Sequence, residues 1–286
     1  MKKWLCLILS LLLCLTVLYP GLAEEAETEE DNTGEVHVVE PSELVEIVAG
    51  DEGETVEPSV PDGVERFIFN GDSRVSVNVR DFPFCAIAYI EATGECGETW
   101  YGSGFVAGKY GNTVVTAAHC LVCPKHGKWA KKLTFYFGYK NRKNYMHKYS
   151  GPWYAWVGNT FTSHEYSYDG DWGVVRLKNE KISNKVGGFG MDFPSDSAVP
   201  SKYVYAAGYS DQTLQKDSGF LTLLDSKHFK YTFDTVKGDS GGPIFTADGY
   251  AVGIVIGETS SSNGVPLYNV GYRLNSEITQ AVDKVQ

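Results

Sequence analysis

The chain has 286 residues, of which 43% are hydrophobic and 13% aromatic, so it can bury a full core as one large or two small domains. Its charge is unevenly spread: residues 24–74 hold 17 acidic and two basic residues, whereas residues 75–286 hold 19 acidic and 21 basic ones. The second part therefore carries only +2, which argues against the broad basic footprint of a nucleic-acid-binding protein.

Residues 1–23 have the layout of a secretory signal peptide. Two lysines precede an apolar run over residues 4–18, and Gly21 and Ala23 supply small residues just before the expected cleavage point. The apolar run is short for a membrane-spanning helix and has the wrong flanks. We therefore expect a secreted, extracellular protein with no membrane contact once the signal is removed.

The next stretch, residues 24–66, is rich in glutamate, poor in aromatic residues and without a sustained period. Such a segment buries too little apolar surface to offset its ordering entropy, which predicts a mobile pro-segment, with a boundary that extends as far as residue 74 in one interpretation. A permanent acidic spacer is the alternative. Because a lysine-rich stretch follows at residues 125–148, we expect the acidic segment to dock there and act as an inhibitor until it is cleaved.

From residue 67 onward, short runs rich in Val, Ile, Tyr and Phe alternate with Gly, Asn, Asp and Pro turns. This texture is typical of an antiparallel all-β sandwich or pair of barrels. The predicted strands are 86–90, 103–107, 113–117, 133–139, 172–177, 203–208, 220–224, 243–245, 250–256 and 268–274. Only the C-terminus reads as a helix, capped by Asn275 or Ser276, with Ile278, Val282 and Val285 on one apolar face.

Four cysteines remain after the signal: Cys85, Cys96, Cys120 and Cys123. An even number in a secreted chain predicts two disulfides, and three pairings are open. The sequence His119-Cys120-x-x-Cys123-x-x-His126 also has the spacing of a zinc cluster, but secretion favours disulfides, and we expect no metal.

The stretch from Lys125 to Lys148 holds eight basic residues and no acidic one, interleaved with aromatic residues. One interpretation is a patch for nucleic acid or another anionic polymer. We favour a pair of strands with a solvated lysine face, and hence no nucleic-acid partner, because the domain lacks a general basic surface.

The segment Gly238-Asp239-Ser240-Gly241-Gly242-Pro243 places a serine between glycines, where a substrate carbonyl can approach and backbone N–H groups can point at a developing oxyanion. Ser240 is therefore a candidate nucleophile. The α/β-hydrolase fold, which also uses G-x-S-x-G, is excluded because it needs a histidine after the serine. Every histidine of this chain comes earlier: His37, His119, His126, His147, His164 and His228.

Two further segments complete a possible catalytic set. Thr116-Ala117-Ala118-His119-Cys120 offers an imidazole among small residues after an apolar run, and Asp171 opens the run Asp171-Trp172-Gly173-Val174-Val175-Arg176-Leu177. A carboxylate can orient an imidazole and stabilise the imidazolium that forms when it takes a proton from a serine. The neutral imidazole is needed first, so activity is expected to fall as the pH drops through the His119 pKa, which is about 6.5 in an unperturbed residue.

These three segments, separated by 52 and 69 residues, resemble those of chymotrypsin-like serine proteases. The resemblance spans about residues 75–286. The bacterial glutamyl endopeptidase branch is most similar, on residues 70–75, 82–87, 186–190 and 234–235. This resemblance implies a fold of two six-stranded antiparallel β-barrels with a C-terminal helix over residues 67–286. It also implies a secreted endopeptidase that acts on proteins or peptides, needs no cofactor and is a monomer. The implied roles are nucleophile for Ser240, general base and acid for His119, orienting carboxylate for Asp171, and oxyanion hole for the N–H groups of Gly238 and Ser240.

The residues that would select the substrate leave the preference open. Asp234 lies where trypsin-like enzymes bind Lys or Arg, but the glutamyl branch has aspartate there too. That branch meets a substrate carboxylate with a histidine, at the position where this chain has Val255, and valine cannot donate a hydrogen bond. Thr235 offers a hydroxyl, Lys237 a positive charge, and Glu258 a negative charge that favours basic substrates.

The sequence leaves two alternatives open, one for the site at which the pro-segment is cleaved and one for the function. Cleavage after Arg74 would free Val75, to pair with Asp239 as in trypsin-like enzymes, whereas cleavage near Glu65 or Arg66 matches the glutamyl branch better. The functional alternative to an endopeptidase is a protease-shaped binding protein or adhesin that has lost turnover.

Overall fold

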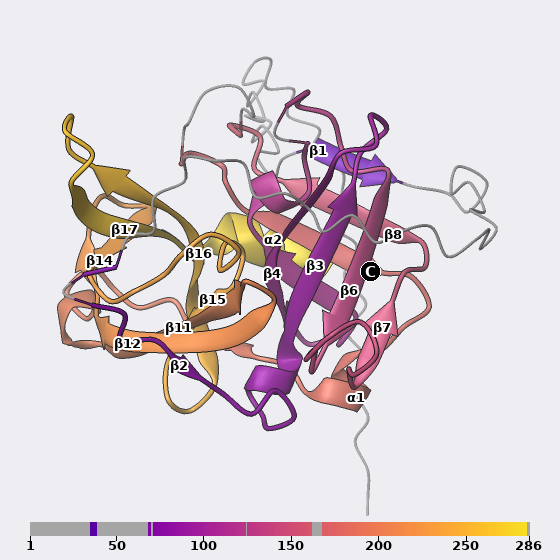
Figure 1. Cartoon of the computed structure of the whole chain (residues 1–286), viewed down its shortest axis with the longest axis horizontal. Helices are drawn as coiled ribbons and strands as arrows, with labels where there is room; N and C mark the ends of the chain where they lie inside the picture. The colour runs from indigo at the N-terminus through magenta and orange to yellow at the C-terminus, as the bar shows by residue number, and fades with distance from the viewer. Residues whose placement is uncertain (1–34, 39–67, 70, 124, 162–167, 285–286) are drawn as a thin grey trace, which may run out of the picture. The chain divides into compact units, whose positions relative to one another are not determined.

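The computed structural model describes residues 35–38, 68, 69, 71–123, 125–161 and 168–284, which form a mostly β structure built on two curled sheets (Figure 1). The predicted signal peptide and most of the predicted pro-segment lie outside these residues. Within the described part, no helix combines the length and the apolar character needed to cross a bilayer.

The first sheet is built from strands between residues 35 and 177, all paired antiparallel. Its order is β1 (Glu35–Val38), β8 (Trp153–Val157), β9 (Gly173–Leu177), β5 (Thr113–Thr116), β4 (Thr99–Ala107), β3 (Ile87–Thr93), β6 (Lys132–Phe137) and β7 (His147–Tyr149).

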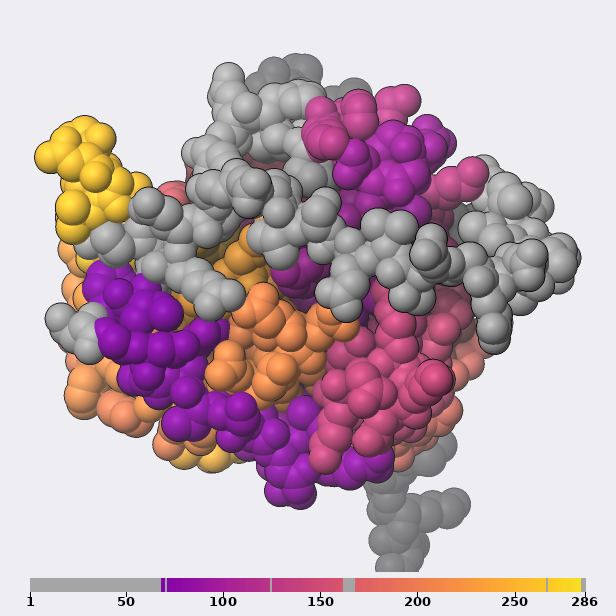
Figure 2. Space-filling view, in the orientation of Figure 1, coloured from indigo at the N-terminus to yellow at the C-terminus, as the bar shows by residue number. Residues whose placement is uncertain are grey.

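The second sheet collects the later strands and one early one. Its order is β13 (Thr222–Leu223), β14 (His228–Tyr231), β17 (Pro266–Arg273), β16 (Tyr250–Ser260), β15 (Pro243–Phe245), β11 (Tyr203–Ser210), β12 (Thr213–Phe220) and β2 (Val75–Ser76), with β10 (Gly190–Met191) parallel to β16. In Figure 2 the indigo-purple stretch that contains β2 runs along the edge of this sheet, where β2 pairs with β12.

The predicted fold class is confirmed, and all ten predicted strands are found within a few residues. The described sheets are larger than six strands because short or polar strands add to them. One is β12, whose sequence TLQKDSGF lacks an apolar pattern and which is a strand because it pairs with β11 along its whole length.

Few helices interrupt the sheets. They are the one-turn elements η1 (Phe84–Ala86), η2 (Ala118–Cys120), α1 (Ser183–Val186) and η3 (Val199–Ser201), and the C-terminal α2 (Ser276–Lys284). As predicted, Asn275 caps α2, because its side-chain oxygen accepts the N–H of Ile278 at 3.1 Å. The apolar face of α2 buries Ile278 and Val282 against the first sheet, and Val285 lies outside the described residues.

The acidic segment contributes one strand. β1 pairs along β8, at the end of the strand order opposite to β6 and β7, which carry the lysine-rich stretch. The expectation of a mobile segment is therefore wrong for the four residues of β1. They pair with β8, whereas charge complementarity predicted docking on residues 125–148.

The lysine-rich stretch is a solvated face, as favoured from the sequence. Its aromatic side chains Phe135, Phe137 and Tyr139 are buried in the core, whereas Lys131 and Lys132 are exposed. These three buried rings cannot stack on the bases of a nucleic acid, whereas Trp129 and Tyr145 of the same stretch are partly exposed.

The two predicted disulfides are absent, since all four described cysteines are free thiols. Cys85 donates to the carbonyl oxygen of Val186 at 3.1 Å and Cys120 to that of Ser240 at 3.4 Å, so each is held in its own part of the core. The sulfurs of Cys96 and Cys123 lie 3.9 Å apart, whereas a disulfide bond is about 2.05 Å long.

Candidate functional site

Strand pairing in the first sheet brings His119 and Asp171 together. β5 and β9 are antiparallel with Thr116 opposite Gly173, so the turn after β5, which carries His119, lies beside the residues before β9, which include Asp171. The Asp171 carboxylate accepts the backbone N–H of His119 at 3.0 Å with one oxygen, and its other oxygen lies 2.7 Å from His119 Nδ1. This contact fixes the ring orientation and leaves Nε2 as the other reactive nitrogen.

Burial and charge act in opposite directions on the imidazole. Burial alone would lower the pKa of His119, but the negative charge of Asp171, followed by the Cys120 sulfur, outweighs it and holds this pKa well above 6.5. The His119 side chain is 37% exposed and that of Asp171 only 7%, so the carboxylate is shielded while the imidazole can reach a substrate.

The turn around Ser240 has a backbone that only glycine permits. Gly238 has φ of +99°, and a Cβ there would lie 2.5 Å from the carbonyl oxygen of Tyr209. Gly241 has φ of +84°, and a Cβ there would lie 2.0 Å from the carbonyl oxygen of Ser103. Both positive φ values and both close approaches require glycine, as predicted from the motif.

This turn also offers backbone donors. The N–H groups of Asp239, Gly241 and Gly242 bind carbonyl oxygens of Val236, Val255 and Asp239, respectively. Within the described part of the chain, the N–H groups of Gly238 and Ser240 find no backbone acceptor. An oxyanion hole requires N–H groups that are not engaged by the protein's own backbone, and these two are the ones predicted from the sequence.

Ser103, which sequence reasoning missed, joins the two halves of the site. This fully buried residue of β4 donates its N–H to the carbonyl of Ser240 at 2.7 Å and its hydroxyl to the carbonyl of Gly238 at 2.8 Å. The hydroxyl also accepts the N–H of Tyr209 at 2.8 Å. Because the thiol of Cys120 reaches the same Ser240 carbonyl, residue 240 lies beside the turn that carries His119. The only signal was the small-residue run Gly102-Ser103-Gly104, which is typical of a strand that another backbone approaches.

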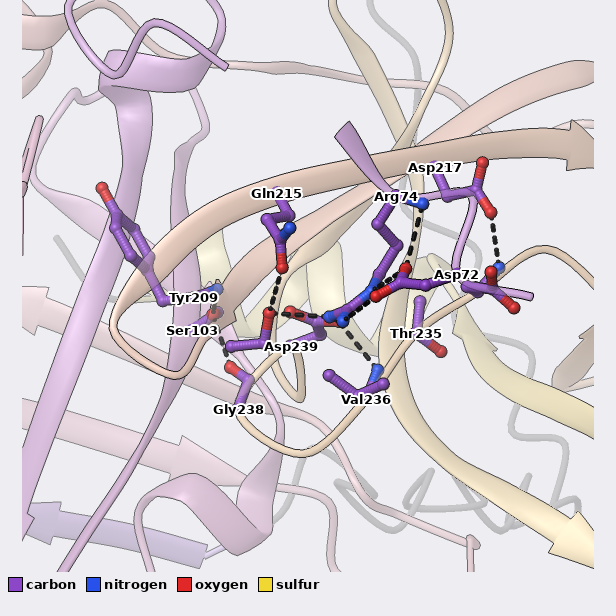
Figure 3. Close-up of polar contacts among 12 residues, drawn as sticks. Asp72, Arg74, Ser103, Tyr209, Gln215, Asp217, Thr235, Val236, Gly238 and Asp239 are labelled. Atoms are coloured by element: carbon purple, nitrogen blue, oxygen red, sulfur yellow. Dashed lines mark hydrogen bonds and ion pairs between the residues drawn. The ribbon is translucent and has the colours of Figure 1, made fainter. Parts of the chain in front are cut away.

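Asp239, the residue before the serine, is bound from the N-terminal side of the domain (Figure 3). Its carboxylate accepts the N–H of Val236 at 2.8 Å and lies 3.9 Å from the guanidinium of Arg74, which also donates to Ser210 at 2.8 Å and to Asp72. Burial raises the pKa of Asp239 to about 7, although these partners favour the charged form. The Arg74 side chain is only 5% exposed, so an internal cation occupies the place expected for a freed amino terminus.

Asp234 is not an open pocket residue. It is buried, and its carboxylate accepts the N–H of Phe69 at 2.8 Å together with the N–H and hydroxyl of Ser73, both at 2.9 Å. These three hydrogen bonds anchor the chain before β2 to the segment that leads to Ser240. The carboxylate of Asp234, which left the substrate preference open in the sequence, is therefore engaged by the protein itself.

The other predicted pocket residues differ in their burial and in what they contact. Val255 is buried and exchanges backbone hydrogen bonds with Gly241 and Gly242, next to Ser240. Thr235 is buried, with its hydroxyl 3.4 Å from that of Tyr231, and Lys237 is exposed.

Glu258 is partly buried, and burial raises its pKa while the nearby His119 opposes the rise. Its side chain thus lies within electrostatic reach of the imidazole. Of the predicted pocket set, Val255 is joined to the Ser240 turn by backbone hydrogen bonds, and Glu258 interacts electrostatically with His119.

Comparison with known proteins supports the resemblance to chymotrypsin-like serine proteases that was seen in the sequence. The family model described as a trypsin-like peptidase domain matches residues 102–254. A glutamyl endopeptidase from Bacillus licheniformis is 26% identical over 221 residues, which cover 74% of this chain and 66% of the relative. An extracellular metalloprotease from Bacillus subtilis is 27% identical over 220 residues, which cover 74% of this chain and 67% of the relative.

The fold also matches that of solved structures. A Glu endopeptidase structure superposes on this chain with a TM-score of 0.64 at 21% identity, over 76% of this chain and 98% of the other. The protease Anisep from Arthrobacter nicotinovorans superposes with a TM-score of 0.58 at 21% identity, over 74% of this chain and 98% of the other. The chain spans slightly less than two thirds of the B. licheniformis relative. Because the family model covers more than half of its 286 residues, including His119, Asp171 and Ser240, this chain belongs to the trypsin-like peptidase family.

Proposed function

We propose that the protein is a secreted serine endopeptidase in which Ser240, His119 and Asp171 form the catalytic triad. The observation that carries the proposal is the 2.7 Å contact between His119 and Asp171, beside a glycine-framed turn whose Gly238 and Ser240 N–H groups have no backbone acceptor among the described residues. These are the parts that acyl transfer to a serine needs.

In the proposed mechanism, Ser240 Oγ attacks the carbonyl carbon of the scissile peptide bond while His119 Nε2 takes the hydroxyl proton. The buried Asp171 carboxylate stabilises the imidazolium, and the Gly238 and Ser240 N–H groups bind the oxyanion. His119 then passes the proton to the leaving amine. Water repeats the sequence on the acyl-enzyme, releasing the acid product and restoring Ser240.

The contacts of Asp234 remove one way in which the protein could select a substrate side chain. Since its carboxylate already accepts three hydrogen bonds from residues 69 and 73, we infer that it does not bind a basic substrate side chain. Acidic preference, suggested by the names of the relatives, would depend on Lys237, because Val255 offers no donor. Basic preference would depend on Glu258.

We also propose that cleavage of the pro-segment occurs before Phe69. Phe69, Ser73 and Arg74 are bound to Asp234 and Asp239 within the folded domain, so a cut after Arg74 would remove those contacts. N-terminal sequencing of protein recovered from the medium tests both secretion and this boundary. A mature start at Val75 would contradict it.

Labelling with a fluorophosphonate, followed by cleavage of a peptide library, tests the function. We expect the processed protein to be labelled on Ser240 and to cleave peptides, and the matched Ser240→Ala protein to do neither. If the processed protein is not labelled and cleaves nothing, the protease-shaped binding protein is the better description. The library profile also separates acidic from basic preference.

A further inference from the structure

Two turns on the first sheet bring together three side chains that the proposed catalytic mechanism does not use. Cys96 lies in the hairpin between β3 and β4, while Cys123 and His126 lie in the loop that follows η2. The sulfurs of Cys96 and Cys123 are 3.9 Å apart, and Cys123 Sγ lies 3.4 Å from His126 Nδ1. All three donor atoms lie within 4.8 Å of one another.

Backbone hydrogen bonds hold both turns in place. In the hairpin, Gly94 N–H binds the carbonyl of Glu98 at 2.9 Å, and Gly97 N–H binds that of Gly94 at 3.1 Å. In the loop, Cys123 N–H binds the carbonyl of Lys128 at 2.7 Å, and Gly127 N–H binds that of Cys123 at 2.9 Å. The backbone positions of the three residues are therefore set by the fold.

Two of the three spacings between the donor atoms fit a tetrahedral ion, and the third, between Cys96 and His126, is at most 4.8 Å. With Zn–S bonds of about 2.3 Å and Zn–N bonds of about 2.0–2.1 Å, tetrahedral angles place two sulfurs about 3.8 Å apart and a sulfur and a nitrogen about 3.6 Å apart. The observed distances of 3.9 and 3.4 Å are close to both values.

We propose that Cys96, Cys123 and His126 form a binding site for one zinc ion, with two thiolates and the imidazole Nδ1 as ligands. The three residues and Trp129 line a cavity of about 260 Å³, which leaves room for a water molecule as the fourth ligand. Glu95 lines it too, but Lys128 lies 3.9 Å from its carboxylate. Binding releases the two thiol protons to solvent.

This site is separate from the candidate catalytic set. His119 is bound to Asp171, and Cys120 faces the Ser240 carbonyl, so neither belongs to it. The four-residue cluster considered from the sequence alone is thus replaced by a set that shares only Cys123 and His126 and adds Cys96. A bound ion would tie the β3–β4 hairpin to the loop that begins just after His119.

Titration of the full chain with Co²⁺, after reduction and without chelator, tests the proposal. Co²⁺ takes tetrahedral sites and reports thiolate ligation by a sulfur-to-metal charge-transfer band. We expect this band to saturate at one Co²⁺ per chain, to disappear when Zn²⁺ is added, and to be accompanied by a change in Trp129 fluorescence. Zn²⁺ should also raise the thermal midpoint.

Matched variants locate the site. Cys96→Ser and Cys123→Ser should lose the band and the Zn²⁺-dependent rise in midpoint, and His126→Asn should weaken binding. Cys85→Ser and His147→Asn, which change the same residue types elsewhere, should behave as the parent. Circular dichroism checks that each variant is folded.

Three results would overturn the proposal. One is a folded, reduced parent that gives no charge-transfer band. Another is a band that survives in folded Cys96→Ser. The third is protein isolated without reductant that contains a Cys96–Cys123 disulfide, seen as the loss of two hydrogens in its mass, and no zinc.

Discussion

The two halves of the candidate site are held in different ways. His119 and Asp171 are positioned by the register of two neighbouring strands, β5 and β9, within one sheet. The turn of Ser240 is bonded to Val255 of its own sheet and is also bound by side chains distant in the sequence, Ser103 of β4 and Arg74 before β2. The first half is therefore set by pairing between strands, whereas the second depends on buried side chains that are distant in the sequence.

The largest expected effect is on the first half, from Asp171→Asn. The amide nitrogen would donate to His119 Nδ1 and hold the ring in the wrong tautomer, which lowers kcat by about 10⁴-fold. Steady-state kinetics on a peptide substrate measures this loss. The thermal midpoint should change little, and a parallel collapse of the fold would show that Asp171 is chiefly structural.

Arg74→Met tests the second half of the site, the turn that carries Ser240. It leaves Asp239 buried beside no cation, at a cost of about 3–5 kcal/mol when the carboxylate is charged. Because burial raises the pKa of Asp239 to about 7, above its unfolded value near 4, the native state keeps the proton between these pH values, and stability falls as the pH rises through 7. Urea unfolding should therefore show a larger loss at pH 8 than at pH 5.

The matched control for this variant is Asp72→Asn, which changes the partially exposed partner of the same guanidinium and should cost much less. An equal loss for Arg74→Met at both pH values would rule out a charged Asp239 as the cause.

Ser103→Ala probes the link between the halves. It leaves the Gly238 carbonyl and the Tyr209 N–H without their buried partner, for a cost of about 1–3 kcal/mol in the free energy of unfolding. Since Gly238 belongs to the proposed oxyanion hole, kcat should fall more than KM rises. Ser201→Ala removes an exposed hydroxyl and serves as the control, and equal behaviour of the two variants would contradict the linking role.

Glu258→Gln should have the smallest effect. In the parent, the pKa of His119 lies above 6.5, so the acid limb of the kcat/KM profile should be centred above pH 6.5. Removing the nearby negative charge lowers this pKa and moves the limb to lower pH. Cleavage after Lys or Arg should weaken by up to about fivefold relative to neutral residues. An unshifted profile would place Glu258 outside the field of the imidazole.

Sequence reasoning predicted the features that local patterns encode. The strand runs, the cap at Asn275 and the glycines around Ser240 each follow from residue type and spacing. The roles of Ser103, Arg74 and Asp234 could not be predicted, because each depends on a partner more than 100 residues away, as in the hydrogen bonds from Ser103 to Gly238 and from Ser73 to Asp234. Cys96 and Cys123 are only 27 residues apart, but their contact could not be predicted either, because only the folding of two turns brings them together.

The pairing of β1 with β8 has a consequence for the processed protein. If residues 24–66 are removed, β1 leaves with them, and the side of β8 that it covered becomes a row of free backbone donors and acceptors. Such a bare strand rim can accept another extended polypeptide by main-chain pairing alone. Maturation would then change how molecules of this protein associate with one another.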